Sequence, residues 1–369
     1  MGLKVVISGG GTGGHIFPGI AVAKAILQLK PDTKILFIGG KGQRESKIVP
    51  DYGFDFAPIL VQGFPRKLSL KWVKVFVKVP AGFFRSLVII SKFKPDVVLG
   101  TGGYVCGPVL LAAWFLRKPV VIQEQNVLPG ITNKILSKLA KEIYVPFAEA
   151  EKFLPQGKTK ITGNPIRSEI VTTPDTHEKL GLDKNKITIT FLGGSQGAKS
   201  INMAMIDALK YLSDMSSKIQ MIHQTGENDF AKVEEAYSKS PFKAIVQPFF
   251  NRIEEIYAAT DLVVCRSGGT VAEVASRGLP AILIPYPYSA GDHQTFNAKA
   301  FEENGAAIML KDNQLTGEIL ANTIISLIKD KDRLSGMAIK SKSLGKPDAA
   351  QDIARSVISL VRENIGFSK

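Results

Sequence analysis

The first residues of the chain form an apolar run, a glycine cluster and an amphipathic segment. Leu3–Ser8 is rich in β-branched residues, Gly9–Gly14 is mostly glycine, and Ile16–Lys30 carries apolar residues at helical spacing. A short β-branched run favours a buried strand, and a period of 3.6 residues favours a helix. The pattern therefore predicts a strand, a tight loop and a helix in succession.

Similar apolar runs continue through the first half of the chain. They are Ile35–Ile38, Asp96–Leu99, Pro119–Gln123 and Ile143–Val145, and we expect the last of them to be the final strand of this half. Strands that alternate with helical segments predict a parallel sheet covered by helices on both faces.

The same pattern restarts in the second half. It opens with a strand at Ile187–Leu192, a loop at Gly193–Gly197 and a helix at Ser200–Tyr211. Further strands are expected at Gln220–Gln224, Lys243–Gln247, Leu262–Cys265 and Ala281–Pro285. A chain of 369 residues suits two domains, and a boundary within Thr162–Thr173 gives domains of 1–163 and 164–348. The predicted fold class is α/β, with two Rossmann-like parallel-sheet domains.

Charge and cysteine content narrow the class of protein. The formal net charge of +14 favours anionic partners such as nucleotides, acidic lipid or nucleic acid. Cys106 and Cys265 are the only cysteines, so a reducing compartment is the simpler interpretation. The N-terminal sequence predicts no signal peptide, and no apolar run approaches the roughly 20 residues that span a bilayer.

Three glycine-rich loops are candidate binding sites, and each follows a predicted strand: Gly9–His15, Gly100–Gly107 and Gly193–Gly197. The first contains GxGxxG but lacks the acid that binds ribose in NAD or FAD domains, with Glu45 the nearest. It also lacks the Lys-Ser/Thr pair of a Walker A loop. A turn without a ligand remains an alternative. Backbone amides at such loops suit a diphosphate, and we expect the three loops to converge on one crevice.

Two polar segments of the second half are further candidates. Arg266–Glu273 offers a glycine pair to phosphate, and Glu273 can accept two hydrogen bonds from a ribose diol. The alternative is a carboxylate that only stabilises the first turn of a helix. Pro285–Asn297 gathers polar side chains suited to sugar hydroxyls, or it is a polar loop with Asp292 as a helix cap.

Histidines are scarce, and His15 is the one placed to act as a general base or to hydrogen-bond a substrate. His223 lies in an apolar strand pattern and is expected to be structural, whereas His177 is expected at the surface. No metal-ligand spacing occurs apart from Asp330-Lys331-Asp332, a formal DxD that we discount because it lies in a lysine-rich surface stretch.

The stretch 64–94 is basic and aromatic and contains no acidic residue. Its members are Arg66, Lys67, Lys71, Lys74, Lys78, Arg85, Lys92 and Lys94, interleaved with Phe64, Leu68, Trp72, Val73, Phe76, Val77, Phe83, Phe84 and Phe93. Such a segment is typical of binding to an anionic membrane surface. The alternative is a core-facing helix with a solvated lysine face. Nucleic acid is disfavoured because no nucleic-acid-binding signature occurs.

Several long motifs together resemble one family. GGGTGGHIFPGIAVA, KPDVVLGTGGYVCGP, VIQEQNVLPGITNK, ITGNPIR, FLGGSQGAKSIN and CRSGGTVAE, in this order, are similar to the MurG family, and the resemblance covers essentially the whole chain. It implies the glycosyltransferase-B fold with an interdomain cleft, and a last helix, 349–369, that returns to the first domain. It also implies inverting, metal-independent transfer of N-acetylglucosamine (GlcNAc) from UDP-GlcNAc to the muramoyl C4 hydroxyl of lipid I, the undecaprenyl-diphospho-MurNAc-pentapeptide. The product is lipid II, in peptidoglycan synthesis. No cofactor is implied.

The resemblance also assigns residues and a location. Donor contacts fall to Arg167, Ser195, the backbone of Phe250, Gly268, Gly269, Thr270, Glu273, His293 and Gln294. Acceptor contacts fall to Thr12, Gly13, Gly14, His15 and Tyr104, while Glu124 and Asn126 face the reacting sugars. The implied location is peripheral, on the cytoplasmic face of the cell membrane, with a place in a cell-wall synthesis complex.

Three departures from the family pattern affect the donor side. Arg266–Glu273 is one residue shorter than the common version, His293 stands where some members carry glutamine, and Phe250 replaces a smaller aliphatic residue. His15 is the first candidate for the base that removes the hydroxyl proton, with Glu124 behind it. Two alternatives remain open: a transferase that glycosylates diacylglycerol, and a non-catalytic nucleotide-sugar sensor.

Overall fold

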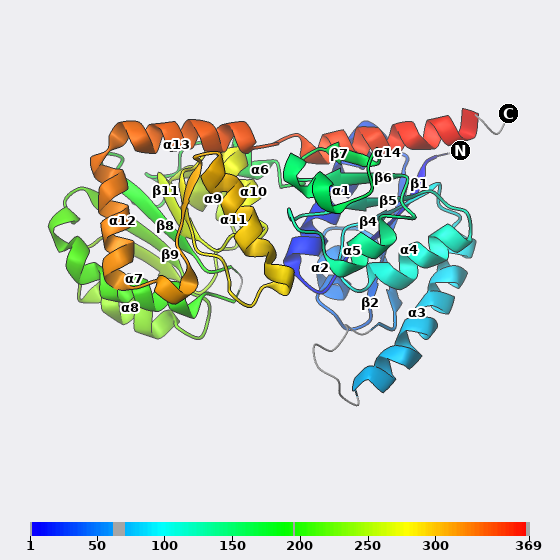
Figure 1. The fold of residues 1–369 in the computed structure, drawn as a ribbon, viewed down its shortest axis with the longest axis horizontal. Helices are drawn as coiled ribbons and strands as arrows, with labels where there is room; N and C mark the ends of the chain where they lie inside the picture. Colours follow the sequence, from blue (N-terminus) through cyan, green and yellow to red (C-terminus); the bar gives the residue numbers. More distant parts are fainter. Residues whose placement is uncertain (1, 62–70, 195, 367–369) are drawn as a thin grey trace. The chain divides into compact units, whose positions relative to one another are not determined.

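The protein consists of two compact units of α/β structure (Figure 1). The structure, a computed structural model, describes residues 2–61, 71–194 and 196–366. The first unit is Met1–Ile166 together with Pro347–Lys369, and the second is Arg167–Lys346. The change of unit thus falls between Ile166 and Arg167, within the stretch expected to hold the boundary and three residues beyond position 163.

The first unit is built on a parallel sheet of seven strands, in the order β3-β2-β1-β4-β5-β6-β7. The strands are β1 (Lys4–Ser8), β2 (Lys34–Gly40), β3 (Asp55–Ile59), β4 (Val97–Gly100), β5 (Val120–Gln123), β6 (Glu142–Val145) and β7 (Thr159–Ile161). The helices are α1 (Gly13–Leu29), α2 (Glu45–Asp51), α3 (Lys71–Phe93), α4 (Cys106–Phe115), α5 (Ile131–Leu136), the 3₁₀ helix η1 (Ala148–Phe153) and α14 (Ala349–Gly366).

The second unit repeats the plan with a parallel sheet of six strands, in the order β10-β9-β8-β11-β12-β13. The strands are β8 (Ile187–Leu192), β9 (Ile219–Gln224), β10 (Ala244–Gln247), β11 (Leu262–Cys265), β12 (Ala281–Leu283) and β13 (Ala307–Met309). The helices are α6 (Glu169–Thr172), α7 (Lys199–Leu212), η2 (Ser213–Met215), α8 (Phe230–Ser238), α9 (Ile253–Ala258), α10 (Thr270–Arg277), η3 (Ala290–Asp292), α11 (His293–Glu303), η4 (Asp312–Gln314), α12 (Gly317–Lys329) and α13 (Lys331–Leu344).

The predicted fold class is confirmed, and the differences lie at the sheet edges. The expectation that Ile143–Val145 ends the first sheet was wrong, because β7 pairs with β6 beyond it. β3 and β13 are further edge strands that the apolar pattern did not indicate. Edge strands need no continuous apolar run, since one of their sides is not covered by another strand. The first helix also begins earlier than expected, so that Gly13, Gly14 and His15 form its first turn.

Helices cover both faces of the first sheet, and one of them comes from the far end of the sequence. α14 packs beside α1, and Ile353, Val357 and Val361 share a buried cluster with Ile20 of α1 and the strand residue Val5. On the other face, α3 and α4 pack against strand residues. Burial of these side chains on both faces anchors the loops at the strand ends.

Candidate active site

The loops that follow β1, β4 and β5 lie together at one edge of the first sheet. These strands are neighbours in the parallel sheet, with Ser8 paired to Gly100 and Gly100 to Ile122. The strand order reverses between β1 and β4, and crevices at such switch points bind ligands in open α/β sheets. A close approach links the first two loops: a Cβ on Gly103, which has φ +84°, would lie 2.3 Å from the carbonyl oxygen of Gly10. Only glycine fits this position.

Glu45 is a residue of this site whose role the sequence pattern did not indicate. It is fully buried, and its carboxylate accepts hydrogen bonds from the amides of Gly11, at 3.1 Å, and Gly40, at 2.9 Å. The acid nearest to the ribose-binding position of a dinucleotide domain is therefore occupied in holding the first glycine loop. This contact supplies a physical reason why the GxGxxG motif is not an NAD or FAD site.

His15 lies in the first turn of α1 and reaches the loop after β5. Its Nδ1 atom is 2.9 Å from Oε1 of Gln125, and its carbonyl oxygen accepts a hydrogen bond from the Thr101 hydroxyl. Thr12 precedes the helix, and its side chain caps no backbone amide there. Thr12 and Gly14 are exposed, so the start of α1 is open to an anionic ligand.

Tyr104 stands beside the first glycine loop. A Cβ on Gly11 would lie 3.4 Å from its ring. Burial, followed by the charge of Glu45, raises the pKa of the Tyr104 hydroxyl above its usual value. The phenol therefore stays protonated at neutral pH and can donate a hydrogen bond to an anion.

Glu124 is buried and serves as the centre of the loop after β5. Its Oε1 atom accepts from the amides of Gln125 and Asn126 and from the Asn126 side chain, at 2.8–3.1 Å. Its Oε2 atom accepts from the amide of Gly130 and the side chain of Asn133. Five donors therefore occupy the two oxygens of this carboxylate and tie it to the backbone and side chains of its own loop and of Asn133. The geometry thus gives Glu124 a positioning role and disfavours it as the base.

In the second unit, Glu273 lies one turn into α10 and is hydrogen-bonded by a buried tyrosine. The Tyr257 hydroxyl donates to Oε2 of Glu273 over 2.9 Å. Burial raises the pKa of Glu273 above the usual glutamate value, while the Tyr257 hydrogen bond and the charge of Arg167 lower it. Arg167 also lies 3.8 Å from Glu254. This group of residues holds a carboxylate at the start of a helix, where a diol can reach it.

The loops after β11 and β12 are joined through Gln294. Its Oε1 atom accepts from the amide of Tyr286, and its carbonyl oxygen accepts from the hydroxyl of Ser267. Its Nε2 group lies 3.5 Å from a Cβ built on Gly268. A Cβ on Gly269 would meet nothing within 4 Å, so its backbone borders open space just before Thr270 begins α10.

The other residues that the family resemblance assigns to the donor lie on or near α11 and in the loops after β8 and β10. His293 begins α11, and its Nδ1 atom lies 2.8 Å from the carbonyl oxygen of Ala290. Asp292 precedes it but makes no hydrogen bond to the helix backbone; it accepts from the Thr295 hydroxyl. The amide of Phe250 donates to the side chain of Gln224. Ser195 lies outside the described residues.

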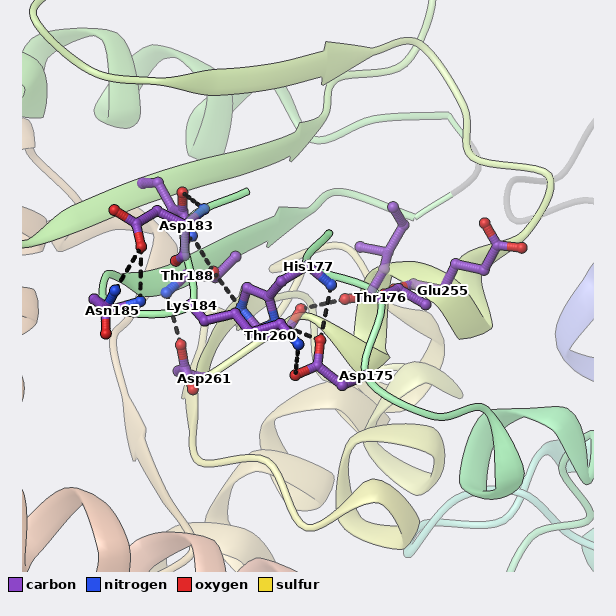
Figure 2. Close-up of polar contacts among 12 residues, drawn as sticks. Asp175, Thr176, His177, Asp183, Lys184, Asn185, Thr188, Glu255, Thr260 and Asp261 are labelled. Carbon is purple, nitrogen blue, oxygen red and sulfur yellow. Dashed lines mark hydrogen bonds and ion pairs between the residues drawn. The ribbon is translucent and has the colours of Figure 1, made fainter. Parts of the chain in front are cut away.

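The other histidines belong to the interior of the second unit. His223 is buried as expected, and burial lowers its pKa to about 3. The expectation that His177 lies at the surface was wrong, because it is 9% exposed. Figure 2 shows its ring between Asp175, 2.8 Å from Nδ1, and Thr188, 3.2 Å from Nε2. Asp261 in turn accepts a hydrogen bond from the amide of Thr188. Through His177 and Thr188, the network joins β8 to the segment that contains Asp175.

Within residues 2–61, 71–194 and 196–366, no group of three or more His, Cys, Asp or Glu side chains is placed to hold a metal ion. Asp330 of the formal DxD accepts from the amide of Arg333 and caps α13, which gives it a structural role.

The architecture and these loops are those of a two-domain glycosyltransferase, and comparison with known proteins agrees. The family model described as the glycosyltransferase family 28 N-terminal domain matches residues 5–145, and the corresponding C-terminal domain matches residues 188–353. The first match runs from β1 to β6, and the second spans the six strands from β8 to β13. The chain is therefore assigned to the glycosyltransferases.

Individual relatives narrow this class. The chain is 44% identical to the UDP-N-acetylglucosamine--N-acetylmuramyl-(pentapeptide) pyrophosphoryl-undecaprenol N-acetylglucosamine transferase of Halothermothrix orenii, over 94% of this chain and 95% of the relative. It is 40% identical to the enzyme of the same name from Myxococcus xanthus, over 99% and 94%. The crystal structure of Acinetobacter baumannii MurG superposes with a TM-score of 0.77 at 30% identity, covering 98% of this chain and 99% of that one. The chain belongs to this family of N-acetylglucosamine transferases, the MurG family.

Proposed function

We propose that the protein transfers GlcNAc from UDP-GlcNAc to the C4 hydroxyl of the muramoyl sugar of lipid I, forming lipid II. The observation that carries this proposal is the near full-length similarity to transferases whose name states both the donor sugar and the undecaprenyl-linked acceptor. The two loop clusters, one in each unit, supply the groups that the reaction needs.

The second unit would bind the donor. Glu273 accepts from the ribose hydroxyls, the carbonyl of Phe250 accepts from the uracil ring, and Gln294 donates to the GlcNAc hydroxyls. The amides of Gly268 and Gly269, with Thr270, face the diphosphate at the start of α10. Arg167, His293 and the loop that holds Ser195 complete the contacts. Backbone amides and helix starts offset the charge of the leaving diphosphate, so we propose that transfer needs no metal ion.

The first unit would bind the acceptor and remove its proton. Thr12, Gly13, Gly14 and Tyr104 contact the lipid diphosphate, and Asn126, held by Glu124, orients the reacting sugars. His15 takes the proton of the C4 hydroxyl as that oxygen attacks the anomeric carbon. The bond from that carbon to the UDP oxygen breaks, and UDP leaves with its electron pair. Attack opposite the leaving group inverts the anomeric centre.

Transfer of labelled GlcNAc to a short-chain lipid I analogue, with and without EDTA, tests this function. Label on the lipid I analogue in both conditions is the expected result, with diacylglycerol as a parallel acceptor. Label on diacylglycerol instead would assign a lipid-glycosylating activity. UDP binding without any transfer would indicate a sensor.

Tyr257→Phe is expected to move the acid limit of UDP binding to higher pH. Binding needs the carboxylate of Glu273, and it is lost as the pH falls through the pKa of that group. Removing the Tyr257 hydroxyl removes a hydrogen bond that lowers this pKa, so the carboxylate protonates at higher pH than in the wild type. Calorimetric titration with UDP across about pH 5–8 measures the change.

Tyr237→Phe is the matched control for this variant. Tyr237 is also a buried tyrosine of the second unit, but its hydroxyl lies 3.3 Å from His223 rather than beside Glu273. The control should retain the wild-type pH dependence of UDP binding. Equal profiles for Tyr257→Phe and the wild type would remove Tyr257 from the donor site.

We also propose that α3, α4 and α5 hold the protein on the cytoplasmic face of the membrane. Within the basic-aromatic stretch, residues 64–70 and the side chains of 71–77 lie outside the described part. Further along, Phe83 packs against the core while Phe84 is 64% exposed, so this helix has both a core-facing side and an exposed apolar side chain. None of the helices in the described part of the chain has the length and apolarity to cross a bilayer.

Neighbouring helices extend this exposed apolar surface beyond the stretch found in the sequence. Its members are Phe84 and Val88 of α3, Leu111, Trp114 and Phe115 of α4, and Ile131 and Ile135 of α5. On and just after α5, the exposed lysines Lys134 and Lys138 alternate with Ile131 and Ile135 at helical spacing. Apolar side chains flanked by lysines suit the headgroup region of an anionic bilayer.

The double variant Ile131→Ser/Ile135→Ser is expected to weaken binding to anionic phospholipid vesicles by at least about tenfold, since each side chain inserted contributes on the order of 1 kcal/mol or more. Vesicle sedimentation measures the bound fraction. Ile339→Ser is the control, because Ile339 is 71% exposed on α13 of the other unit. Equal loss in the control, or no loss in the double variant, would place the membrane contact elsewhere.

A further inference from the structure

We propose that Gln125 fixes the tautomer of His15, so that the Nε2 atom carries the lone pair that receives the proton of the acceptor hydroxyl. This proposal rests on the proposed role of His15 as the base. Gln125 acts through His15 and is a positioning residue. Gln125 belongs to the loop after β5 and is buried, with 6% of its surface exposed.

The contact between the two side chains does not by itself show which ring nitrogen of His15 carries the proton. Nδ1 of His15 lies 2.9 Å from Oε1 of Gln125. A neutral imidazole has one nitrogen that donates and one that accepts. The direction of this hydrogen bond therefore depends on which atom of the Gln125 amide faces the ring.

Groups that can only accept determine the orientation of the Gln125 amide. Its Nε2 group lies 2.6 Å from the carbonyl oxygen of Thr101, and it also contacts Oε1 of Gln123. A flipped amide would place its oxygen against both of these oxygens and lose two hydrogen bonds, which costs several kcal/mol for buried groups. The Oε1 atom of Gln125 must therefore face His15.

The orientation of Gln123 is determined in the same way. Its Nε2 group donates to the carbonyl oxygen of Glu124 and to Oδ1 of Asn164, both at 2.9 Å. Asn164 in turn donates through Nδ2 to the carbonyl oxygen of Gln125, at 2.8 Å. Gln125, Gln123 and Asn164 form a buried amide chain in which every member has an N–H group on a backbone carbonyl. No collective flip of the amide chain preserves these hydrogen bonds.

The amide chain has a direct consequence for the chemistry. Oε1 of Gln125 accepts, so Nδ1 of His15 donates and holds the proton in the neutral ring. Nε2 is then unprotonated and accepts the hydroxyl proton as the oxygen attacks. The resulting imidazolium keeps its Nδ1–H group on Gln125. An imidazole in the opposite tautomer would present an N–H group to the hydroxyl and could not act as a base; in a serine protease, such a change lowers turnover by about 10⁴-fold.

Nitrogen-15 NMR of the histidine rings tests the proposal in the unmodified protein and in two variants. In the wild type, the His15 signals should report the Nδ1–H tautomer. Gln125→Met removes the acceptor with little change in side-chain length. We expect it to shift His15 toward the Nε2–H form and to lower the turnover number for GlcNAc transfer by about 10²-fold, with UDP affinity unchanged.

Gln125→Glu separates positioning from packing, because it loses the two hydrogen bonds of the amide Nε2 group just as Gln125→Met does, with an added cost for its second oxygen, but it retains an acceptor oxygen for Nδ1. It should keep the Nδ1–H form and retain more activity than Gln125→Met. An Nε2–H ring in the wild type, or wild-type turnover and tautomer in Gln125→Met, would overturn the proposal. Full activity of His15→Ala would instead remove the base role from the proposed function, and a tautomer change in Gln125→Met would then still support the positioning contact.

Discussion

Replacing His15 with alanine is expected to lower the turnover number for GlcNAc transfer by about 10²–10⁴-fold, the range that a general base contributes. The physical reason is that no other side chain of the first loop cluster is placed to take the proton. The carboxylate of Glu124 is occupied by five donors, and that of Glu45 by two backbone amides. Rapid-quench transfer assays with saturating substrates measure the change in the chemical step.

The affinity for UDP is the internal control for His15→Ala, since the residues proposed to bind UDP belong to the second unit. It should remain at the wild-type value, as should the melting temperature. A variant that loses UDP binding as well would point to misfolding, and a variant with near-normal turnover would exclude His15 as the base.

In the loop Gly193–Gly197, which follows β8, Gly197→Ala is expected to cause the largest loss of stability, about 3–5 kcal/mol. Gly197 has φ +76°, and a Cβ there would lie 1.9 Å from the carbonyl oxygen of Thr225. The backbone of the loop or of the segment after β9 would have to move, and with it the loop amides that we propose to bind the diphosphate. Thermal unfolding and UDP titration measure the two effects.

Gly194→Ala separates steric collision from backbone strain in the same loop. Gly194 has a similar φ of +78°, but a Cβ there would meet nothing within 4 Å. This control should therefore lose only the cost of a left-handed alanine, about 1 kcal/mol. Equal destabilisation by the two substitutions would show that the contact with Thr225 does not constrain the loop.

The central strands of both sheets could be predicted because burial on both faces leaves a continuous apolar run in the sequence. β1, β4 and β5 are fully buried along most of their length. β7 has no fully buried residue, and β3 has one. An edge strand of this kind carries no apolar signature, so the sequence pattern gave no reason to expect it.

The candidate site likewise contains residues that a local sequence pattern reveals and residues that it does not. Glycine loops at strand ends could be predicted from local spacing alone, whereas for Glu273 spacing left a helix-stabilising alternative open and the ribose role came from the family resemblance. The residues that hold them could not, because their partners are distant in sequence: Gln125 lies 110 residues from His15, and Glu45 lies 34 from Gly11. His177 was misplaced for a related reason. Its burial depends on Thr188 and on the rest of its network, none of which a local polar pattern reveals.

The position of α14 in the first unit has a consequence for biosynthesis. Ile353 and Val357 complete the buried cluster around α1, yet they leave the ribosome only after the whole of the second unit. The second unit, Arg167–Lys346, is continuous in sequence and can close its core while translation is still in progress. The first unit begins before the second but is completed only after it, so its apolar surface around α1 stays uncovered while the second unit is made, when chaperones or the membrane itself can contact it.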